Sequence, residues 1–166
     1  MNLDHPPIHG TIALDSLRPD GTETGLLAVT RHLLVTLADP ATQAWHLAFG
    51  IAAERWGQGE GPRIAMAAYA LVAALARART VPVRHCDPLS PEDRTRATPE
   101  EAALIGMIRA MQRDLTDEAR RHVAALTGGR MDAAVIGAGL TLARALPRPA
   151  TRPVMVAAHG GLGRLH

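Results

Sequence analysis

Apolar residues recur at helical spacing along most of this chain, and that pattern limits the fold more than any other feature of the sequence. In residues 24–38, for example, Leu26, Val29, Leu33 and Leu37 fall on one side of a helix. Similar stripes follow in residues 40–56, 62–79, 99–115, 116–127 and 131–146. The sequence therefore predicts an all-α fold, a compact bundle of about six helices.

Capping residues and prolines predict where several of these helices begin. Asp39 is suited to cap the second helix, with Pro40 at its first position. Thr98 and Glu101 form the pattern of a capping box on either side of Pro99, which marks the start of the fourth helix. These starts are local signals, so they are predicted independently of how the helices pack.

Irregular segments are expected between the third and fourth helices, where a long loop lies, and at both ends of the chain. The length falls within the usual size range of one domain, so we expect residues 1–166 to form a single helical domain. Within it, residues 1–21 form an N-terminal arm that is extended or contains a short strand, and residues 147–166 form a C-terminal tail rich in proline and glycine. No repeat of fixed period is visible in the sequence.

The composition excludes several kinds of site and location. A single cysteine cannot form an internal disulfide or a tetrathiolate metal site within one chain. All 18 basic residues are arginine, which removes Schiff-base chemistry on lysine. Residues 1–10 lack the regions of a secretory signal, and the longest nearly uncharged apolar stretch, residues 64–76, is too short to span a bilayer. We therefore expect a cytoplasmic protein that does not insert into membranes.

The charge distribution makes nucleic acid an unlikely partner. The 18 arginines are opposed by 16 acidic residues, so the formal net charge is only +2. Five arginines flank the central loop, and three acidic residues lie among them: Arg77, Arg79, Arg84, Arg94 and Arg96, with Asp87, Glu92 and Asp93. Nucleic-acid-binding domains concentrate basic residues on one face, and surfaces that stack on bases need several aromatic rings. Residues 144–166 contain four arginines and no acidic residue, but such a tail is more often solvated than a binding arm, and the sequence has only four aromatic residues.

The central loop is the strongest candidate for a chemical site, because it holds His85, the single cysteine Cys86 and Asp87. Imidazole, thiolate and carboxylate groups are all ligands for transition metals. The loop lacks the regular spacing of established metal motifs, so a site would need another histidine from elsewhere in the fold. The histidines considered for that role are His32, His46 and His122.

A catalytic role for Cys86 is not favoured by its immediate neighbours. Adjacent side chains on an extended chain point to opposite sides, so His85 is a poor base for the Cys86 thiol. Asp87-Pro88 and Ser90-Pro91 are common turn initiators, and local geometry explains their presence. We therefore predict no catalytic residues and expect no cofactor, apart from the transition metal that a metal site would require.

Two helices carry residues that are candidates for an interface. Trp45, Phe49 and Trp56 project from one edge of the second helix, within about 40° of one another. Core anchoring is the simpler interpretation, and an interface is the alternative, because aromatic residues are enriched there. The last helix is apolar and contains Gly137 and Gly139, which permit close approach of another backbone. We expect that helix at the centre of the bundle or at a two-fold interface.

The leading hypothesis is a non-enzymatic helical protein that acts through protein–protein contact and self-associates as a homodimer. The alternative is a metal- or small-ligand-binding helical protein that uses the loop His85-Cys86-Asp87. A dimer without stoichiometric metal would contradict the alternative, whereas a monomer with one bound ion would contradict the leading hypothesis.

Overall fold

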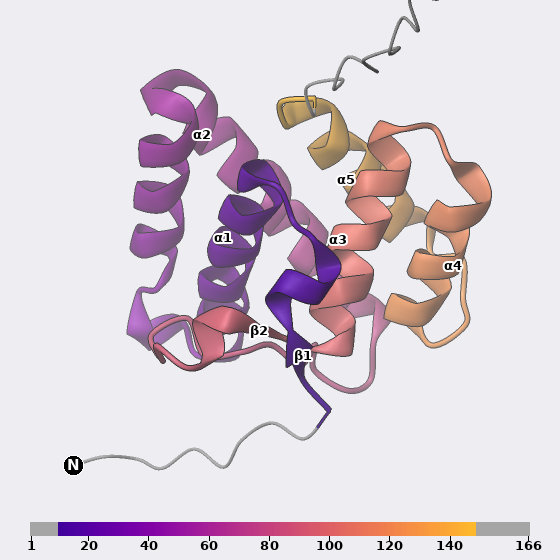
Figure 1. Ribbon diagram of the computed structural model, residues 1–166, viewed down its shortest axis with the longest axis horizontal. Helices are drawn as coiled ribbons and strands as arrows, with labels where there is room; N and C mark the ends of the chain where they lie inside the picture. Colours follow the sequence, from indigo (N-terminus) through magenta and orange to yellow (C-terminus); the bar gives the residue numbers. More distant parts are fainter. Residues whose placement is uncertain (1–9, 149–166) are drawn as a thin grey trace, which may run out of the picture.

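Five α-helices and a short two-stranded sheet make up residues 10–148, the part of the chain that the computed structural model describes (Figure 1). The helices are α1 (Gly21–Ala38), α2 (Trp45–Ala78), α3 (Pro99–Gln112), α4 (Thr116–Thr127) and α5 (Ala133–Ala145). The strands are β1 (Ile12–Ala13) and β2 (Arg96–Ala97), and short 3-10 helices lie at Leu14–Leu17, Pro40–Thr42 and Asp93–Thr95. The all-α bundle predicted from the sequence is confirmed.

The helix α2 is a hairpin of two limbs. Its backbone leaves the helical region at Gly57, where φ is 83° and ψ is 162°. Residues 45–56 form the first limb and residues 58–78 the second, and the two limbs meet at this turn and diverge from it (Figure 1). They approach closely at Gly61, where an added Cβ atom would lie 2.6 Å from the Cα of Ala53 and closer still to the carbonyl oxygen of Ala52. The predicted second and third helices are therefore these two limbs.

The predicted start of the second helix at Asp39 is wrong. Asp39 caps only a short 3-10 helix, in which its side chain accepts a hydrogen bond from the backbone N–H of Ala41 at 3.0 Å. Gln43 then adopts a left-handed conformation with φ of 51°, and α2 begins at Trp45. An aspartate followed by proline starts a tight turn as readily as a long helix, because both need the same first hydrogen bond.

Capping determines where α1 and α3 begin. The box predicted for α3 is confirmed, with the backbone N–H of Glu101 donating to Thr98 Oγ1 at 3.1 Å and that of Thr98 donating to Glu101 Oε2 at 2.8 Å. A second box, formed by Asp20 and Glu23, starts α1 at Gly21, earlier than the predicted residue 24. The helix α3 ends at Gln112, short of the predicted residue 115, and a turn follows in which Asp114 has a φ of 57°.

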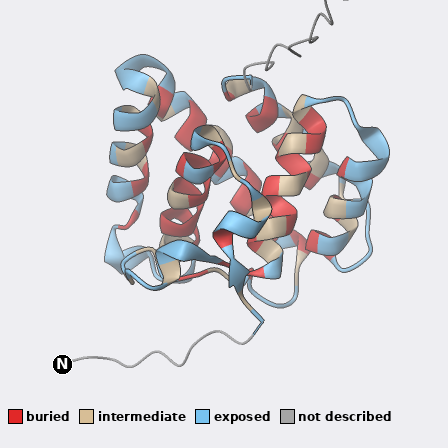
Figure 2. Ribbon diagram, in the orientation of Figure 1, coloured by how far each residue is buried: buried red, intermediate tan, exposed pale blue. Residues whose placement is uncertain are grey.

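The hydrophobic core lies between the helices, and buried residues line their facing sides (Figure 2). Every helix contributes to it, and its largest fully buried side chains include Leu26, Leu33, Leu71, Leu75, Ile105, Ile108, Leu126 and Leu142. The first limb of α2 stands at the edge of the bundle and is exposed along its outer side (Figure 2).

The helices α1 and α3 occupy equivalent positions in two similar halves of the bundle. Each begins with a capping box closed by a glutamate, Glu23 or Glu101, at the third position of the helix. In each helix an arginine, Arg31 or Arg109, follows at the same spacing from that glutamate. Each glutamate binds the arginine of the other helix. Reciprocal contacts of this kind are what a two-fold relation between the helices produces.

The remaining helices repeat the same order of buried positions. Buried residues of α2 correspond in sequence to buried residues of the second half, as in the pairs Ala48 and Ala119, Ala52 and Val123, Ile64 and Val135, Leu71 and Leu142, and Leu75 and Leu146. Gly57 and Gly128, both with positive φ, end the corresponding helices. The first helix of the first half and its connection to the second are longer, so the two halves share no fixed sequence period.

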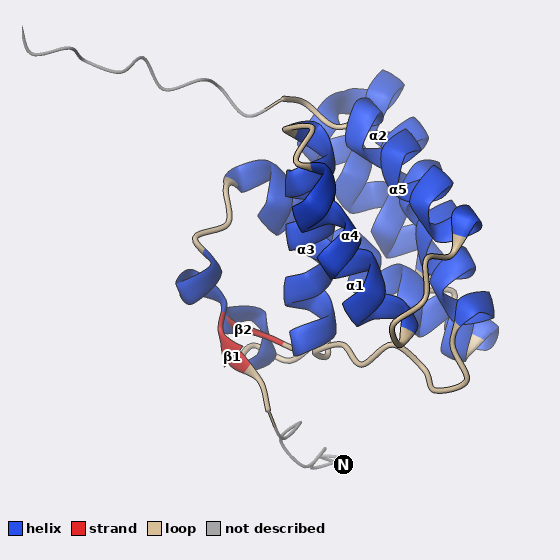
Figure 3. Ribbon diagram, turned by 90° about the vertical axis from the view of Figure 1, so that its right-hand side faces the viewer, coloured by secondary structure: helices blue, strands red, loops and turns tan. Residues whose placement is uncertain are grey.

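The short sheet joins the segment before α1 to the segment before α3. β1 and β2 pair antiparallel, with Ile12 opposite Ala97 and Ala13 opposite Arg96. Figure 3 shows this sheet at one end of the bundle. Part of the predicted N-terminal arm therefore has regular structure, while residues 1–9 and 149–166 lie outside the described residues.

Candidate functional site

A buried ion pair between α1 and α3 holds the central loop. Arg31 Nε donates to Glu101 Oε1 at 2.7 Å, and the two side chains are only 5% and 3% exposed. The Arg31 guanidinium also donates to the carbonyl oxygens of Asp93 and Arg96, at 3.2 Å and 2.6 Å. Glu101 Oε1 accepts the backbone N–H of Cys86 at 3.1 Å. The pair thus satisfies backbone groups of the loop and fixes it against α1 and α3.

The thiol of Cys86 is protected by this arrangement. Cys86 is 0% exposed, and burial, reinforced by the negative charge of Glu101, raises the pKa of its thiol to about 12. The thiolate is the form that attacks electrophiles and binds metals, so a thiol with such a pKa is unreactive near neutral pH.

The side chains of His85 and Asp87, on either side of Cys86, contact backbone groups of the loop. Nδ1 of His85 lies 3.1 Å from the carbonyl oxygen of Cys86, and Asp87 accepts the backbone N–H of Leu89 at 2.8 Å in a turn. Within residues 10–148, no three His, Cys, Asp or Glu side chains are grouped so that they could hold a metal ion. A metal on His85, Cys86 and Asp87 stays a prediction from the sequence.

The three aromatic residues predicted at an interface differ in exposure along the first limb of α2. Trp45 is 42% exposed, and its ring stacks on that of His46 at a centroid distance of 3.5 Å. The Phe49 ring meets Trp45 edge to face at 6.1 Å and is partly buried against the core. Trp56 is also partly buried, and a Cβ atom on Gly25 of α1 would lie 3.3 Å from its ring. Packing on the bundle therefore increases from Trp45 to Trp56.

The two glycines of α5 also differ in how closely they pack against the bundle. Gly139 is buried, and a Cβ atom there would lie 3.0 Å from the sulfur of Met111, so α5 approaches α3 closely at this point. Gly137 is exposed, and no atom of residues 10–148 lies within 4 Å of a Cβ atom added to it. One side of α5 thus packs on α3, and the other faces outward.

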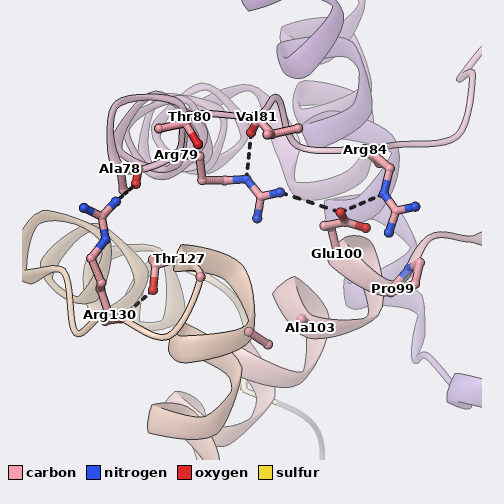
Figure 4. A pocket seen from close by; sticks show the side chains of 12 residues that line it. Ala78, Arg79, Thr80, Val81, Arg84, Pro99, Glu100, Ala103, Thr127 and Arg130 are labelled. Carbon is pink, nitrogen blue, oxygen red and sulfur yellow. Dashed lines mark hydrogen bonds and ion pairs between the residues drawn. The ribbon is translucent and has the colours of Figure 1, made fainter.

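A cleft of about 570 Å³ opens where the ends of α2, α3 and α4 meet (Figure 4). We call it the arginine cleft; its lining includes Arg79, Arg84, Glu100, Ala103, Thr127 and Arg130. Three cations and one carboxylate line it, so its charge is positive. A volume in this range is typical of sites for small molecules.

The carboxylate of Glu100 contacts two of the arginines that line this cleft. Glu100 Oε1 accepts a hydrogen bond from Arg84 Nε at 2.8 Å and lies 3.7 Å from Arg79 Nη2. The hydrogen bond to Glu100, followed by the charge of Glu100, raises the pKa of Arg84 above its ordinary value. The other oxygen, Glu100 Oε2, is buried and accepts no hydrogen bond from residues 10–148. Buried polar atoms usually have partners, so this oxygen is an exception.

The other contacts of the cleft come from helix ends. Arg79 Nη1 donates to the carbonyl oxygen of Leu126 at 2.5 Å, near the end of α4, and Arg130 donates to that of Ala78, the last residue of α2. Carbonyl groups at helix C-termini lack partners within the helix, and these arginines supply them.

Sequence reasoning identified only part of this cleft. The sequence predicts that Arg79 and Arg84 flank the central loop, but no sequence pattern connects them with Glu100 and Arg130. No local signal could have joined these residues, because they meet only where three helix ends converge.

None of the helices in the described part of the chain is both long and apolar enough to cross a membrane. In comparisons with known proteins, no family model, no curated protein and no solved structure matches the chain.

Proposed function

We propose that this chain is a non-enzymatic helical protein that acts through protein–protein contact, and that it self-associates through the outer side of α2. The observation that carries the proposal is the exposure of Trp45, 42% of whose side chain faces solvent. Its contacts with His46 and Phe49 hold the indole in one orientation. A rigid, amphipathic aromatic ring loses little conformational freedom when a partner covers it.

Other large apolar side chains are exposed elsewhere on α2, one on the first limb and two on the second. They are Leu47, Met66 and Tyr69, with exposures of 50%, 56% and 38%. Single exposed apolar residues are ordinary on protein surfaces, whereas an ordered and exposed tryptophan is of a residue type enriched at interfaces. Self-association is the simplest form of such contact, because a second copy presents the same surface and closes the assembly as a dimer.

Sedimentation velocity over a range of protein concentrations tests the proposal. We expect the wild-type chain to form a dimer whose population grows with concentration. Trp45→Ser should weaken that dimer at least about tenfold, since truncating a buried tryptophan at an interface costs about 2 kcal/mol or more. The matched control is Met131→Ser, which removes an apolar side chain of similar exposure, 46%, before α5.

Two outcomes would contradict self-association through α2. One is a wild-type chain that stays monomeric at about 1 mM, a concentration at which even weak specific contacts are populated. The other is an equal loss of dimer in Trp45→Ser and Met131→Ser, since the surface carrying Trp45 would then have no special role.

Small-ligand binding, the second candidate function, is supported by the arginine cleft rather than by the central loop. The specific observation is a positively charged cavity of about 570 Å³, whereas the thiol of Cys86 is buried.

A further inference from the structure

The arginine cleft contains more hydrogen-bond donors than the fold uses. Arg79 is fully engaged: Nε donates to the carbonyl oxygen of Val81 at 3.0 Å, Nη1 to that of Leu126, and Nη2 faces Glu100. Its side chain is only 15% exposed, so it joins the loop to α3 and α4. Arg79 is therefore a structural contact.

Arg84 and Arg130 differ from Arg79 in this respect. Within residues 10–148, Arg84 donates a side-chain hydrogen bond only through Nε, to Glu100, and its side chain is 51% exposed. Arg130 donates only through Nη2, to the carbonyl oxygen of Ala78. Both Nη groups of Arg84, and Nε and Nη1 of Arg130, therefore have donors available. A guanidinium anchored through one nitrogen is held in place to bind a carboxylate or phosphate through the others.

The two arginines stand at opposite sides of the cleft, with Arg79 and Glu100 between them (Figure 4). The lining of the cleft also includes apolar side chains, among them Ala103 and Ala125. A ligand that reaches both arginines must therefore have anionic groups at two separated points.

We propose that the arginine cleft binds a small organic dianion, a molecule whose two carboxylate or phosphate groups are joined by a spacer. One anionic group lies on Arg84 and the other on Arg130. The positive excess in the lining attracts a dianion, and the carboxylate of Glu100 opposes binding of a longer polyanion.

Isothermal titration at constant ionic strength tests this inference with glutarate, a dicarboxylate with an apolar spacer. Butyrate, a monocarboxylate of similar length, measures the contribution of the second charge, and inorganic phosphate tests an anion without a spacer. We expect glutarate to saturate the cleft and to bind at least about tenfold more tightly than butyrate, because the second guanidinium contributes only to the dianion. A phosphate that binds as tightly as glutarate would overturn the requirement for two separated groups.

Three variants locate the site. Arg84→Gln and Arg130→Gln should each weaken glutarate binding about tenfold, and Ala125→Phe should abolish it by filling the cleft without changing its charge. Arg63→Gln is the matched control, since Arg63 is 75% exposed, pairs with Glu60 and lies outside the cleft. Circular dichroism confirms that each variant is folded, and Ala125→Phe keeps the test decisive if Arg130→Gln is destabilised.

Several results would overturn the inference. Glutarate that fails to saturate at about 10 mM would exclude a specific site. An equal loss in Arg63→Gln would show that only the net charge matters. A polyglutamate peptide that binds where glutarate does not would assign the cleft to an acidic protein segment. None of these results depends on whether the chain dimerises through α2.

Discussion

The two halves of the bundle make the same ion pair in different surroundings. Arg31 and Glu101 are 5% and 3% exposed, whereas Arg109 and Glu23, their equivalents, are 30% and 11% exposed. Both pairs are bidentate, with distances between 2.6 Å and 3.1 Å. The difference arises because the central loop covers the first pair, whereas the second stands nearer the solvent. Geometry alone therefore does not determine the role of an ion pair; what covers it does.

The halves also differ in the turn that follows the first limb of α2 and, in the second half, α4. In the first half, α2 folds back directly at Gly57 and its limbs meet at Gly61. In the second half, α4 ends at Gly128, and α5 begins only after Asp132, which caps it. The exposed Trp45 lies on the first half, whereas the arginine cleft lies where the ends of α2, α3 and α4 meet. The shared architecture supplies the scaffold, and the positions that differ supply the binding groups.

The largest effect is expected from removing the buried arginine. Arg31→Met leaves the Glu101 carboxylate without its counter-charge in the interior, so the free energy of unfolding should fall by about 3–5 kcal/mol. Arg109→Met should cost about 1–2 kcal/mol, because Glu23 is closer to solvent. Urea denaturation followed by tryptophan fluorescence measures both. Equal losses would contradict the conclusion that burial distinguishes the two pairs.

A double variant tests the cause of that loss. Arg31→Met combined with Glu101→Leu leaves no charge in the interior, so it should be less destabilised than Arg31→Met alone. A double variant as unstable as the sum of its single variants would show that the hydrogen bonds to the loop matter more than the unpaired charge.

The next largest effect is expected at the close approach within α2. Gly61→Ala places a Cβ atom against the backbone of Ala52 and Ala53, so it should destabilise the protein by about 3 kcal/mol. Gly137→Ala is the matched control, because it lies in a helix with open space around it and should stabilise by up to about 1 kcal/mol. Thermal unfolding of both variants checks the difference. A Gly61→Ala variant as stable as wild type would contradict the tight hairpin.

Alanine substitutions at Gly57 and Gly128, the two equivalent turn glycines, should reduce stability by less than Gly61→Ala does. Gly57 has φ of 83° and ψ of 162°, a conformation almost restricted to glycine, and Gly57→Ala should cost about 2 kcal/mol. Gly128 has φ of 68° and ψ of 40°, the left-handed region, and Gly128→Ala should cost about 1 kcal/mol. Both sites have open space around them, so backbone strain is the only expected cause. Gly128→Asn should be nearly neutral, while Gly57→Asn should not.

Most of the fold was predictable because its determinants are local. Helical stripes and capping residues act within a few residues, and they located the helices and the box at Thr98. The box formed by Asp20 and Glu23 follows the same pattern and could have been found in the same way. The start at Asp39 was wrong because a short turn shares the signal of a helix start.

The site was less predictable because its contacts are distant in sequence. Arg31 and Glu101 are 70 residues apart, and nothing local to Arg31 distinguishes it from an exposed arginine on the polar side of a helix. Glu101 was explained fully by capping, yet the same carboxylate also binds Arg31 and the backbone of Cys86. Only the packing of α1 against α3 brings these functions together.

The smallest expected effect is the pH dependence of stability that arises from His32 and His122, one histidine in each half. Burial is the main cause that lowers the pKa of both His32 and His122 below 6.5. Asp87 and Glu118 partly oppose the respective shifts, whereas Arg94 acts with burial at His32, and Arg121 and Arg109 do so at His122. The folded protein therefore binds fewer protons than the unfolded chain just below pH 6.5. Stability that is present above this pH should decrease as the pH falls toward the lowered pKa values.

Urea denaturation between about pH 7.5 and about pH 5.5 measures this decrease, since histidine is the main side chain that titrates in this window. His32→Gln and His122→Gln should each flatten the dependence of stability on pH, because glutamine cannot take up the proton in either state. His46→Gln is the control, as His46 is exposed beside Trp45. A slope that changes as much in His46→Gln as in the other two variants would show that burial is not its cause. A slope that changes in only one of the two halves would show that their histidines, like their ion pairs, are not equivalent in energy.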